Sequence, residues 1–196
     1  TRTPYFGICY GFQWAVVEFA RHVAGLVDAD STEVNEETPH KVIYKLRDLL
    51  GVDDLGGTMR LGSYECQLTP GSLAAKLYGS SVITERHRHR YEFNCLYEKT
   101  LTDQGLRVVG RSTDGKFVEI VEIPDHPCFI AVQFHPEFKS RPLTPHPLFA
   151  GFIAAVSLSI EPICSPSLRM TAPSISIFIV LVLVFGFRRR KRQCVR

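Results

Sequence analysis

The clearest pattern near the start of the chain is a short apolar run that leads directly into a helical repeat. The run at residues 5–8 is predicted to form a buried strand that ends at Cys9. Beyond Cys9, the apolar residues recur at intervals of three and four, the period of one buried helix face: Phe12, Ala15, Val16, Phe19, Ala20 and Val23. We therefore predict a strand that turns at Cys9 into a helix, with Gly25 as a C-cap near its end.

Three further strands are predicted in the second half of the chain, at residues 106–111, 117–123 and 128–134. The dipeptide Asp114-Gly115 is typical of a hairpin turn and separates the first two strands. Apolar and acidic residues alternate in the middle strand, so we expect one of its faces to meet solvent.

The remaining segments give weaker signals. Residues 28–40 are polar and acidic and indicate a loop, whereas residues 40–50 fit either a strand or a short helix. One or two helical turns are predicted at 72–77, and a closing helix at 147–156 is expected to pack through Leu148, Phe149 and Phe152.

Two runs are rich in residue types that often bind ligands. Residues 54–62 are rich in glycine, but they lack the strand-to-helix context and the Lys-Ser/Thr pair of a phosphate loop. The run Glu85-Arg-His-Arg-His-Arg-Tyr-Glu-Phe-Asn94 is predicted to be a solvated loop that faces an anionic substrate or another domain. A single short basic cluster does not indicate nucleic-acid binding, and His87 and His89 lack a third metal ligand nearby.

Composition fits one globular domain with a proper core, since 45% of the 196 residues are hydrophobic and 22% are charged. The net charge of +3 comes from the end of the chain, where six basic residues lie between Arg188 and Arg196, and the body is net acidic. This balance indicates neither nucleic-acid nor anionic-membrane binding by the body. Six scattered cysteines, no C-x-x-C pair and no visible signal peptide predict reduced thiols and a cytoplasmic location.

Cys9 has a setting that favours a nucleophile. A free cysteine is usually a small buried hydrophobe. Here, however, Gly7 and Gly11 flank it at a strand-to-helix turn, where they leave room for a strained backbone and for close approach of a substrate. The N–H groups and dipole of the helix N-terminus would favour the thiolate, which is the reactive form.

His135 and Glu137 form the second candidate group. His135 follows an apolar strand, the position where active-site residues of α/β sheets gather. Glu137 comes two residues later, so in an extended backbone its carboxylate would lie on the same side and orient the imidazole. A histidine in such a loop is otherwise a surface residue, but pairing with an elbow cysteine favours a catalytic role.

Together these motifs resemble the class I glutamine amidotransferase family. The pattern consists of Gly7-Ile-Cys-Tyr-Gly-Phe-Gln13 followed later by His135-Pro-Glu137. The runs at 54–62, 85–94, 132–141 and 146–152 are more specifically similar to the glutaminase domain of CTP synthases, over about residues 4–156. The resemblance implies an α/β fold with a flavodoxin-like sheet flanked by helices, incomplete at the N-terminus.

The resemblance also implies a role for each matching residue. Cys9 would attack the side-chain amide of glutamine, His135 would move protons, and Glu137 would hold the His135 tautomer. The Tyr10 backbone N–H would be an oxyanion donor. Four further positions match those that hold the substrate glutamine in this family: Gln13, Glu33, Arg90 and the Tyr91 backbone. Of these, Glu33 would bind the amino group of the glutamine.

For the whole enzyme, the family implies ammonia transfer to a synthetase domain that converts UTP to CTP with ATP and Mg²⁺, GTP as an activator, and a homotetramer. No cofactor and no metal are expected in the domain at 1–156. The nucleophile is only the ninth residue of the chain, so we expect the synthetase domain and part of an oxyanion loop to be missing. The chain alone is then expected to be a feeble glutaminase that cannot make CTP.

Beyond residue 156 the resemblance stops. Residues 157–174 indicate a Pro/Ser-rich linker, and 175–196 combine an apolar run at 175–187 with a basic tail. That run has about 13 residues, against the ~20 that span a bilayer. A gene-model artefact, a membrane anchor that would give membrane association, and a buried helix or strand all stay open.

Two other functions compete with an amidotransferase. A catalytically silent interaction module would retain the fold without the chemistry. A cysteine peptidase with the same triad type would share the elbow, but it would not explain the runs at 56–62 and 85–94.

Overall fold

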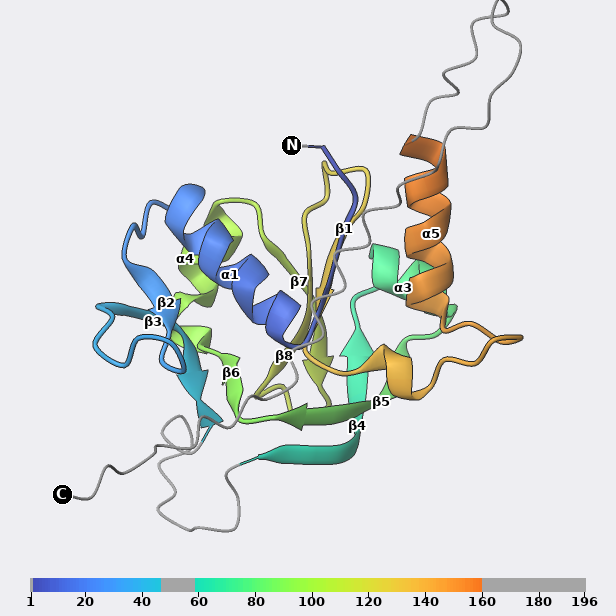
Figure 1. Ribbon diagram of the computed structural model, residues 1–196, viewed down its shortest axis with the longest axis horizontal. Coiled ribbons are helices and arrows are strands. Elements are labelled where there is room, and N and C mark those ends of the chain that lie inside the picture. Colours follow the sequence, from blue (N-terminus) through green and yellow to red (C-terminus); the bar gives the residue numbers. More distant parts are fainter. Residues whose placement is uncertain (1, 47–58, 160–196) are drawn as a thin grey trace, which may run out of the picture.

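The chain folds into an α/β structure, shown as a computed structural model in Figure 1, which describes residues 2–46 and 59–159. Within these ranges a mixed six-stranded sheet lies between two helical layers, with α1 and α4 on one face and α3 and α5 on the other. Across the sheet the strands run in the order β1 (Tyr5–Ile8), β9 (Phe129–Val132), β8 (Val118–Glu122), β7 (Arg107–Ser112), β4 (Arg60–Leu68) and β5 (Val82–His89).

A smaller three-stranded sheet packs beside α1. It consists of β2 (Ala29–Ser31), β3 (His40–Lys45) and β6 (Tyr91–Phe93). The helices are α1 (Tyr10–His22), α3 (Leu73–Tyr78), α4 (Glu98–Asp103) and α5 (Pro147–Ser159), and two 3₁₀ turns lie at Cys95–Tyr97 (η1) and Pro136–Phe138 (η2).

Alternation along the strands divides the interior into two apolar cores. In β9, Ala131 joins the core beneath α1 and α4, whereas Ile130 and Val132 join the core beneath α3 and α5. Leu148 of α5 is fully buried in the second core. Burial on both faces explains why β9 reads as a nearly continuous apolar run.

Most predicted elements are present at the predicted places. The strand, the turn at Cys9 and the following helix form β1 and α1, although the helix ends at His22 and Gly25 lies three residues beyond, at φ 73°. The turn at 72–77 is α3, whose N-terminus is capped by the Ser72 hydroxyl. The ambiguous segment 40–50 begins as the strand β3, and the loop predicted at 28–40 contains the short buried strand β2.

The expectation that one face of 117–123 meets solvent is wrong. All five residues of β8 are buried, including Glu119 and Glu122. Glu122 is buried because its carboxylate accepts hydrogen bonds from the first N–H groups of α3, at Leu73 (3.1 Å) and Ala74 (2.7 Å). Glu119 is buried because it pairs with Arg60 and His87, each at 2.7 Å.

The prediction of a solvated loop at 85–94 is also wrong. The run forms the end of β5 and all of β6, and every second residue of β5 points inward. Glu85, His87 and His89 are buried, whereas the arginines between them are exposed. Polarity alone suggested solvent, but each buried group is matched by an opposite charge or a hydrogen bond.

The glycine-rich run at 54–62 lies mostly outside the described residues, as do the apolar run at 175–187 and all but the first residues of the linker at 157–174. Among the helices within 2–46 and 59–159, none has both the length and the apolar character that a bilayer crossing requires.

Candidate active site

The fold brings Cys9 and His135 together through two neighbouring parallel strands. β1 pairs with β9 in parallel, with Ile8 opposite Val132. The carboxyl ends of parallel strands meet at the same edge of a sheet, so the residues that follow both strands converge. The Cys9 N–H donates to the Val132 carbonyl at 2.7 Å, and this bond fixes the turn against the end of β9.

Cys9 has the strained backbone expected of a nucleophile elbow. Its φ of 50° is the only positive value for a non-glycine residue in the described part of the chain, and its ψ is −98°. A Cβ added to Gly7 would lie 2.9 Å from the Gly11 backbone, so the elbow requires glycine there. The same addition at Gly11 meets only the Tyr5 hydroxyl at 3.7 Å, an ordinary contact. Of the two predicted glycines, only Gly7 is needed for close packing.

His135 is held by the carboxylate that the sequence indicated. Glu137 Oε1 lies 2.6 Å from His135 Nδ1, and the short η2 turn rather than an extended backbone brings them together. Phe138 stacks on the imidazole at a centroid distance of 5.1 Å. The backbone N–H of His135 donates to the backbone carbonyl of Arg86 in β5. These contacts fix the ring with Nε2 left without a hydrogen-bond partner in the described structure.

Electrostatics around Cys9 favour the thiolate. Burial alone would raise the pKa of the thiol, but polar and charge interactions with the His135 and His89 imidazoles outweigh burial and lower this pKa to about 7. Burial alone would lower the pKa of His135, but interactions with Cys9 and Glu137 raise it to about 10. At neutral pH the pair therefore tends toward a thiolate beside an imidazolium.

Two side chains that the sequence analysis did not assign to the site also interact with Cys9. The Gln133 side-chain amide donates toward the sulfur at 3.8 Å, and His89 is the second imidazole that lowers the thiol pKa. Gln133 stands two residues before His135 and is fully buried, a position that the apolar run at 128–134 did not single out. His89 could have been found from the period-two alternation of charged residues in β5.

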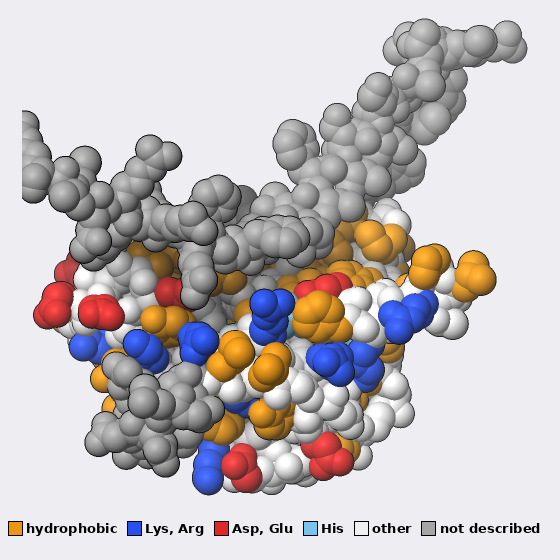
Figure 2. Space-filling view, turned by 60° about the horizontal axis from the view of Figure 1, so that its bottom comes forward, with side chains coloured by type: hydrophobic (Ala, Val, Ile, Leu, Met, Phe, Trp, Pro, Cys, Tyr) orange, Lys and Arg blue, Asp and Glu red, His pale blue; other side chains and the backbone are white. Residues whose placement is uncertain are grey.

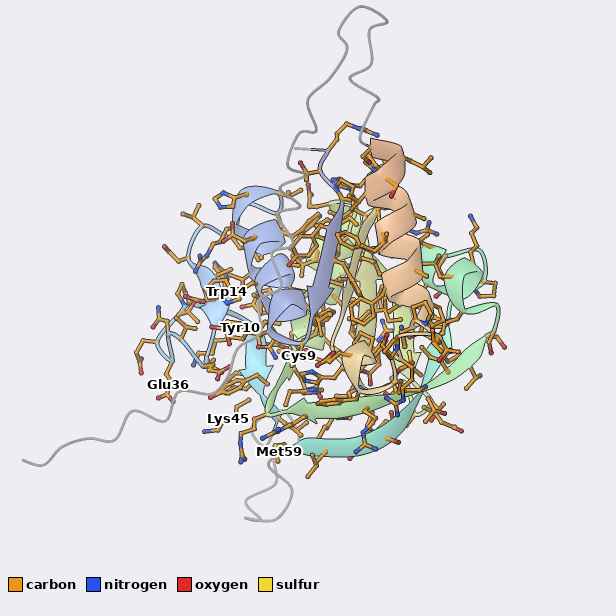
Figure 3. All side chains as sticks on the ribbon, turned by 45° about the vertical axis from the view of Figure 1, so that its right-hand side comes forward. Cys9, Tyr10, Trp14, Glu36, Lys45 and Met59 are labelled. Carbon is orange, nitrogen blue, oxygen red and sulfur yellow. The ribbon has the colours of Figure 1, made fainter. Side chains whose placement is uncertain are left out.

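The residues predicted to hold a substrate are only partly drawn together. Tyr10 is the first residue of α1, and Figure 3 shows it beside Cys9 with Trp14 further along the helix. Gln13 donates from Nε2 to the Tyr91 carbonyl at 3.0 Å, across 78 positions of sequence. Glu33 is exposed in the turn after β2, and within the described ranges no hydrogen bond connects its carboxylate to these residues.

Arg90 lies between the site and the small sheet. It separates His89, the last residue of β5, from Tyr91, the first residue of β6. Its carbonyl accepts a hydrogen bond from the Leu46 N–H at 2.9 Å, and its side chain is exposed.

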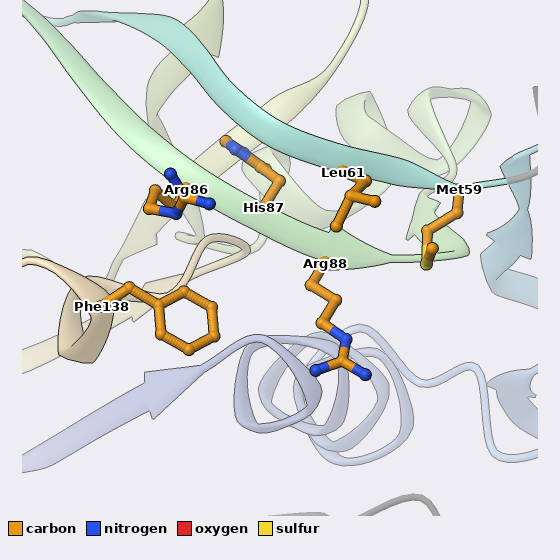
Figure 4. Close-up of a pocket in the computed structure, with 6 residues that line it drawn as sticks. All are labelled: Met59, Leu61, Arg86, His87, Arg88 and Phe138. Atoms are coloured by element: carbon orange, nitrogen blue, oxygen red, sulfur yellow. The ribbon is translucent and has the colours of Figure 1, made fainter.

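A pocket of about 530 Å³ is lined in part by Phe138, the same side chain that stacks on the His135 imidazole. Figure 4 shows Arg86 and Arg88 on its wall, together with Met59, Leu61, His87 and Phe138. On the face of the molecule shown in Figure 2, Lys and Arg side chains are interspersed with apolar ones. Neither Cys9 nor His135 is among the residues that line the pocket.

The side chains within 2–46 and 59–159 include no group of three His, Cys, Asp or Glu residues arranged to hold a metal ion. The pairs around Cys9 join an imidazole to a carboxylate, which suits proton transfer and thiolate stabilisation.

An elbow cysteine at a sheet edge, joined to a histidine–carboxylate pair, defines a class of enzyme domain. The family model described as glutamine amidotransferase class-I matches residues 1–155, and the chain belongs to this family. The fold is accordingly that of a class I glutamine amidotransferase, as the resemblance implied.

Within this family the chain is similar to CTP synthases. It is 59% identical to the CTP synthase of Acidobacterium capsulatum over 161 residues, which is 82% of this chain and 29% of that protein. It is 57% identical to that of Rubrobacter xylanophilus over 172 residues, 88% of this chain and 30% of that protein. The chain thus spans about three tenths of the length of these relatives.

A solved structure supports the same assignment. The glutaminase domain of Trypanosoma brucei CTPS with bound acivicin superposes with a TM-score of 0.75 at 39% identity. The match covers 80% of this chain and 61% of that one. The chain is therefore related to the glutamine amidotransferase domain of CTP synthases in both sequence and fold.

Proposed function

We propose that this domain hydrolyses L-glutamine to glutamate and ammonia with Cys9 as the nucleophile. The observation that carries the proposal is Cys9 with its positive φ at the N-terminus of α1, interacting with an imidazole whose other nitrogen is held by Glu137. A lowered thiol pKa supports it, because a nucleophile is most useful when it is ionised near the working pH.

In the first half of the reaction, the Cys9 thiolate attacks the side-chain carbonyl carbon of glutamine. A C–S bond forms, and the carbonyl oxygen becomes an oxyanion. The Tyr10 N–H lies in the first turn of α1, where backbone N–H groups have no intrahelical acceptor, and is therefore assigned as an oxyanion donor. His135 gives its proton to the departing nitrogen, the C–N bond breaks, and ammonia leaves a glutamyl thioester.

In the second half, water attacks the thioester while His135, now neutral, accepts the water proton. The C–S bond breaks, glutamate leaves and the thiolate–imidazolium pair is restored. Glu137 serves both halves, because a carboxylate on Nδ1 orients the ring and keeps Nε2 facing the reaction.

We assign Gln13, Glu33, Arg90 and the Tyr91 backbone to glutamine binding. The bond between Gln13 and the Tyr91 carbonyl supports this assignment, because it joins the first turn of α1 to the corner between β5 and β6. Glu33 would pair with the ammonium group of the substrate glutamine, and the exposed Arg90 would pair with the α-carboxylate of the same substrate.

For a whole enzyme that contains this domain, we propose that the ammonia aminates UTP to CTP in a cytoplasmic CTP synthase. ATP with Mg²⁺, the activator GTP, the synthetase domain and a tetrameric assembly belong to this proposal through the similarity to CTP synthases.

The test is ammonia release from L-glutamine by the full chain and by two matched serine variants. Cys9→Ser is expected to reduce release to the uncatalysed background, because a serine hydroxyl is not ionised by this site. Cys95→Ser replaces an exposed cysteine in η1 and is expected to retain release. Equal release by both variants would contradict the assignment of Cys9.

A silent interaction module is tested in the same samples. A folded chain that releases no ammonia, and whose Cys9 is not labelled by a glutamine-mimicking electrophile, would support that alternative. Labelling of Cys9 alone, mapped by mass spectrometry, is the result expected for the enzyme.

A further inference from the structure

A second imidazole–carboxylate pair lies beside Cys9, and the reaction described above does not use it. His89 Nε2 lies 2.7 Å from Glu92 Oε1, and both side chains are almost completely buried, with exposures of 3% and 1%. The His135–Glu137 pair is more open, at 18% and 32%. The cysteine thus interacts with two pairs of the same chemistry in different surroundings.

The buried pair belongs to a chain of alternating charges behind the site. Arg60 Nη1 lies 3.3 Å from Glu92 and 2.7 Å from Glu119, and Glu119 in turn lies 2.7 Å from His87. Four strands supply these groups, and adjacent members carry opposite charge when the histidines are protonated. Buried charges persist only where they are paired in this way.

The free nitrogen of His89 is the one available to Cys9. Nε2 is held by Glu92, and Nδ1 is buried and forms no ordinary hydrogen bond among the described residues. His89 is nevertheless one of the two imidazoles that interact with the thiol. The bond from Gln13 to the Tyr91 carbonyl, two residues beyond His89, ties this corner of the sheet to the helix that begins after Cys9.

We propose that His89, held by Glu92, is a positioning residue that remains an imidazolium and stabilises the Cys9 thiolate, while His135 transfers the protons. This inference deepens the proposed function and rests on it for the identity of the nucleophile. The division of labour follows from access: His135 is open enough to meet substrate and water, whereas His89 is almost completely buried against Glu92 and the ring of His87.

The charge state of His89 agrees with this role. Burial alone would lower the pKa of the imidazole, but the charge of Glu92 and the interactions with Cys9 raise it to about 9. The other charged groups nearby are Arg60, whose charge Glu92 and Glu119 share, and the His135–Glu137 pair, which also interacts with Cys9. A fixed cation at this place favours the thiolate without taking its proton.

The test measures how the alkylation rate of Cys9 by iodoacetamide depends on pH, which requires no glutamine hydrolysis. The full chain is used, and the modified tryptic peptide 3–21, whose only cysteine is Cys9, is quantified by mass spectrometry. In the parent protein, the alkylation rate of Cys9 is expected to rise with pH with a midpoint near pH 7. His89→Gln is expected to raise the midpoint by about one pH unit, which slows alkylation at pH 7 about five-fold.

A matched control is His146→Gln. His146 is also a buried histidine paired with a buried carboxylate, Glu85, at 3.0 Å, but it does not interact with Cys9. Its midpoint is expected to stay at that of the parent. An unchanged midpoint in His89→Gln, or an equal shift in both variants, would overturn the proposal.

A second measurement covers the case in which His89→Gln does not fold. The ring nitrogens of His89 are titrated by NMR in the parent and in Cys9→Ser. Coupling is reciprocal, so loss of the thiolate is expected to lower the pKa of His89. An unchanged His89 titration would overturn the proposal. A shifted titration in a chain that releases no ammonia would instead support the His89 role and contradict the glutaminase function.

Discussion

At Cys9, backbone geometry and charge act together. The residue is held at φ 50°, at the start of a helix, and its thiol pKa lies near neutrality despite burial. Neither effect depends on the polar residues of the surface. Substitutions close to the sulfur should therefore affect the chemistry far more than substitutions of exposed charges.

Glu137→Gln is expected to lower kcat for glutamine hydrolysis by about 10²–10⁴-fold with little change in KM. The glutamine amide can donate a hydrogen bond to Nδ1, and the neutral ring would then carry its proton on Nε2. A protonated Nε2 cannot accept a proton from the thiol or from water. Steady-state ammonia release gives both constants. Glu18→Gln, an exposed acid on α1, is the control and is expected to leave them unchanged. A similar loss in both variants would contradict the role of Glu137.

Sequence alone was sufficient to predict that Cys9 and His135 lie near the ends of two strands, with Glu137 beside His135, and the structure has Cys9 directly after β1, His135 three residues after β9 and Glu137 in η2. Sequence was not sufficient to assign His89. Its partners Glu92, Arg60 and Cys9 come from different elements, and only the register of β4 against β5 and the corner into β6 bring them together. Read as a pair, His87 and His89 suggested only a weak metal site.

At the scale of the elements, the β1–α1 turn depends on the absence of one side chain. Gly7 faces the Gly11 backbone so closely that even a methyl group would require the strand or the helix to move. A strand pattern can show where such a turn occurs. It cannot show which flanking glycine is sterically required, because that depends on distances across the turn.

Gly7→Ala is expected to destabilise the fold by about 1–3 kcal/mol, as overpacking does, and to reduce the reactivity of Cys9. Gly11→Ala is the matched control, since its added methyl meets only an ordinary contact and alanine has a higher helix propensity than glycine. Urea unfolding of both variants measures the difference. Equal stabilities would show that the contact at Gly7 relaxes freely.

The sheet shows where pattern reading works and where it fails. The apolar run at 128–134 became β9 because burial on both faces requires continuous apolarity. The strands β8 and β5 contain charged residues at buried positions, so the alternation in β8 and the polarity of residues 85–94 were both taken for exposure. An alternating pattern gives the period of a strand but not the surroundings of its polar face, which here is an ion-pair network.

At the scale of the whole molecule, that network joins strands distant in sequence. Arg60, Glu119 and His87 lie on three strands, and the Arg60 guanidinium also stacks over Tyr64 and Phe117 at 4.6 and 4.7 Å. A buried pair contributes little net stability compared with apolar packing, but the loss of one partner leaves an uncompensated charge.

Glu119→Gln is accordingly expected to reduce the free energy of unfolding by about 3–5 kcal/mol. Burial alone would raise the pKa of Glu119, but His87 and Arg60 outweigh burial and lower it. Its contribution to stability is therefore present above the unfolded pKa of about 4.3 and is lost as pH falls through the lower folded value. Unfolding across acid pH should show less pH dependence in the variant. Lys99→Ala, in an exposed pair with Asp103, is the control and should change stability by less than about 1 kcal/mol.

The conformation of Cys9 also limits which amino acids evolution can place there. At φ 50° a side chain branched at Cβ collides with its own backbone, whereas an unbranched one is tolerated. Threonine, a nucleophile in other hydrolases, is therefore sterically excluded, while serine and cysteine both fit. The geometry of the turn thus favours a nucleophile carried on an unbranched Cβ, and the two imidazoles beside it favour sulfur, the atom that ionises near neutral pH.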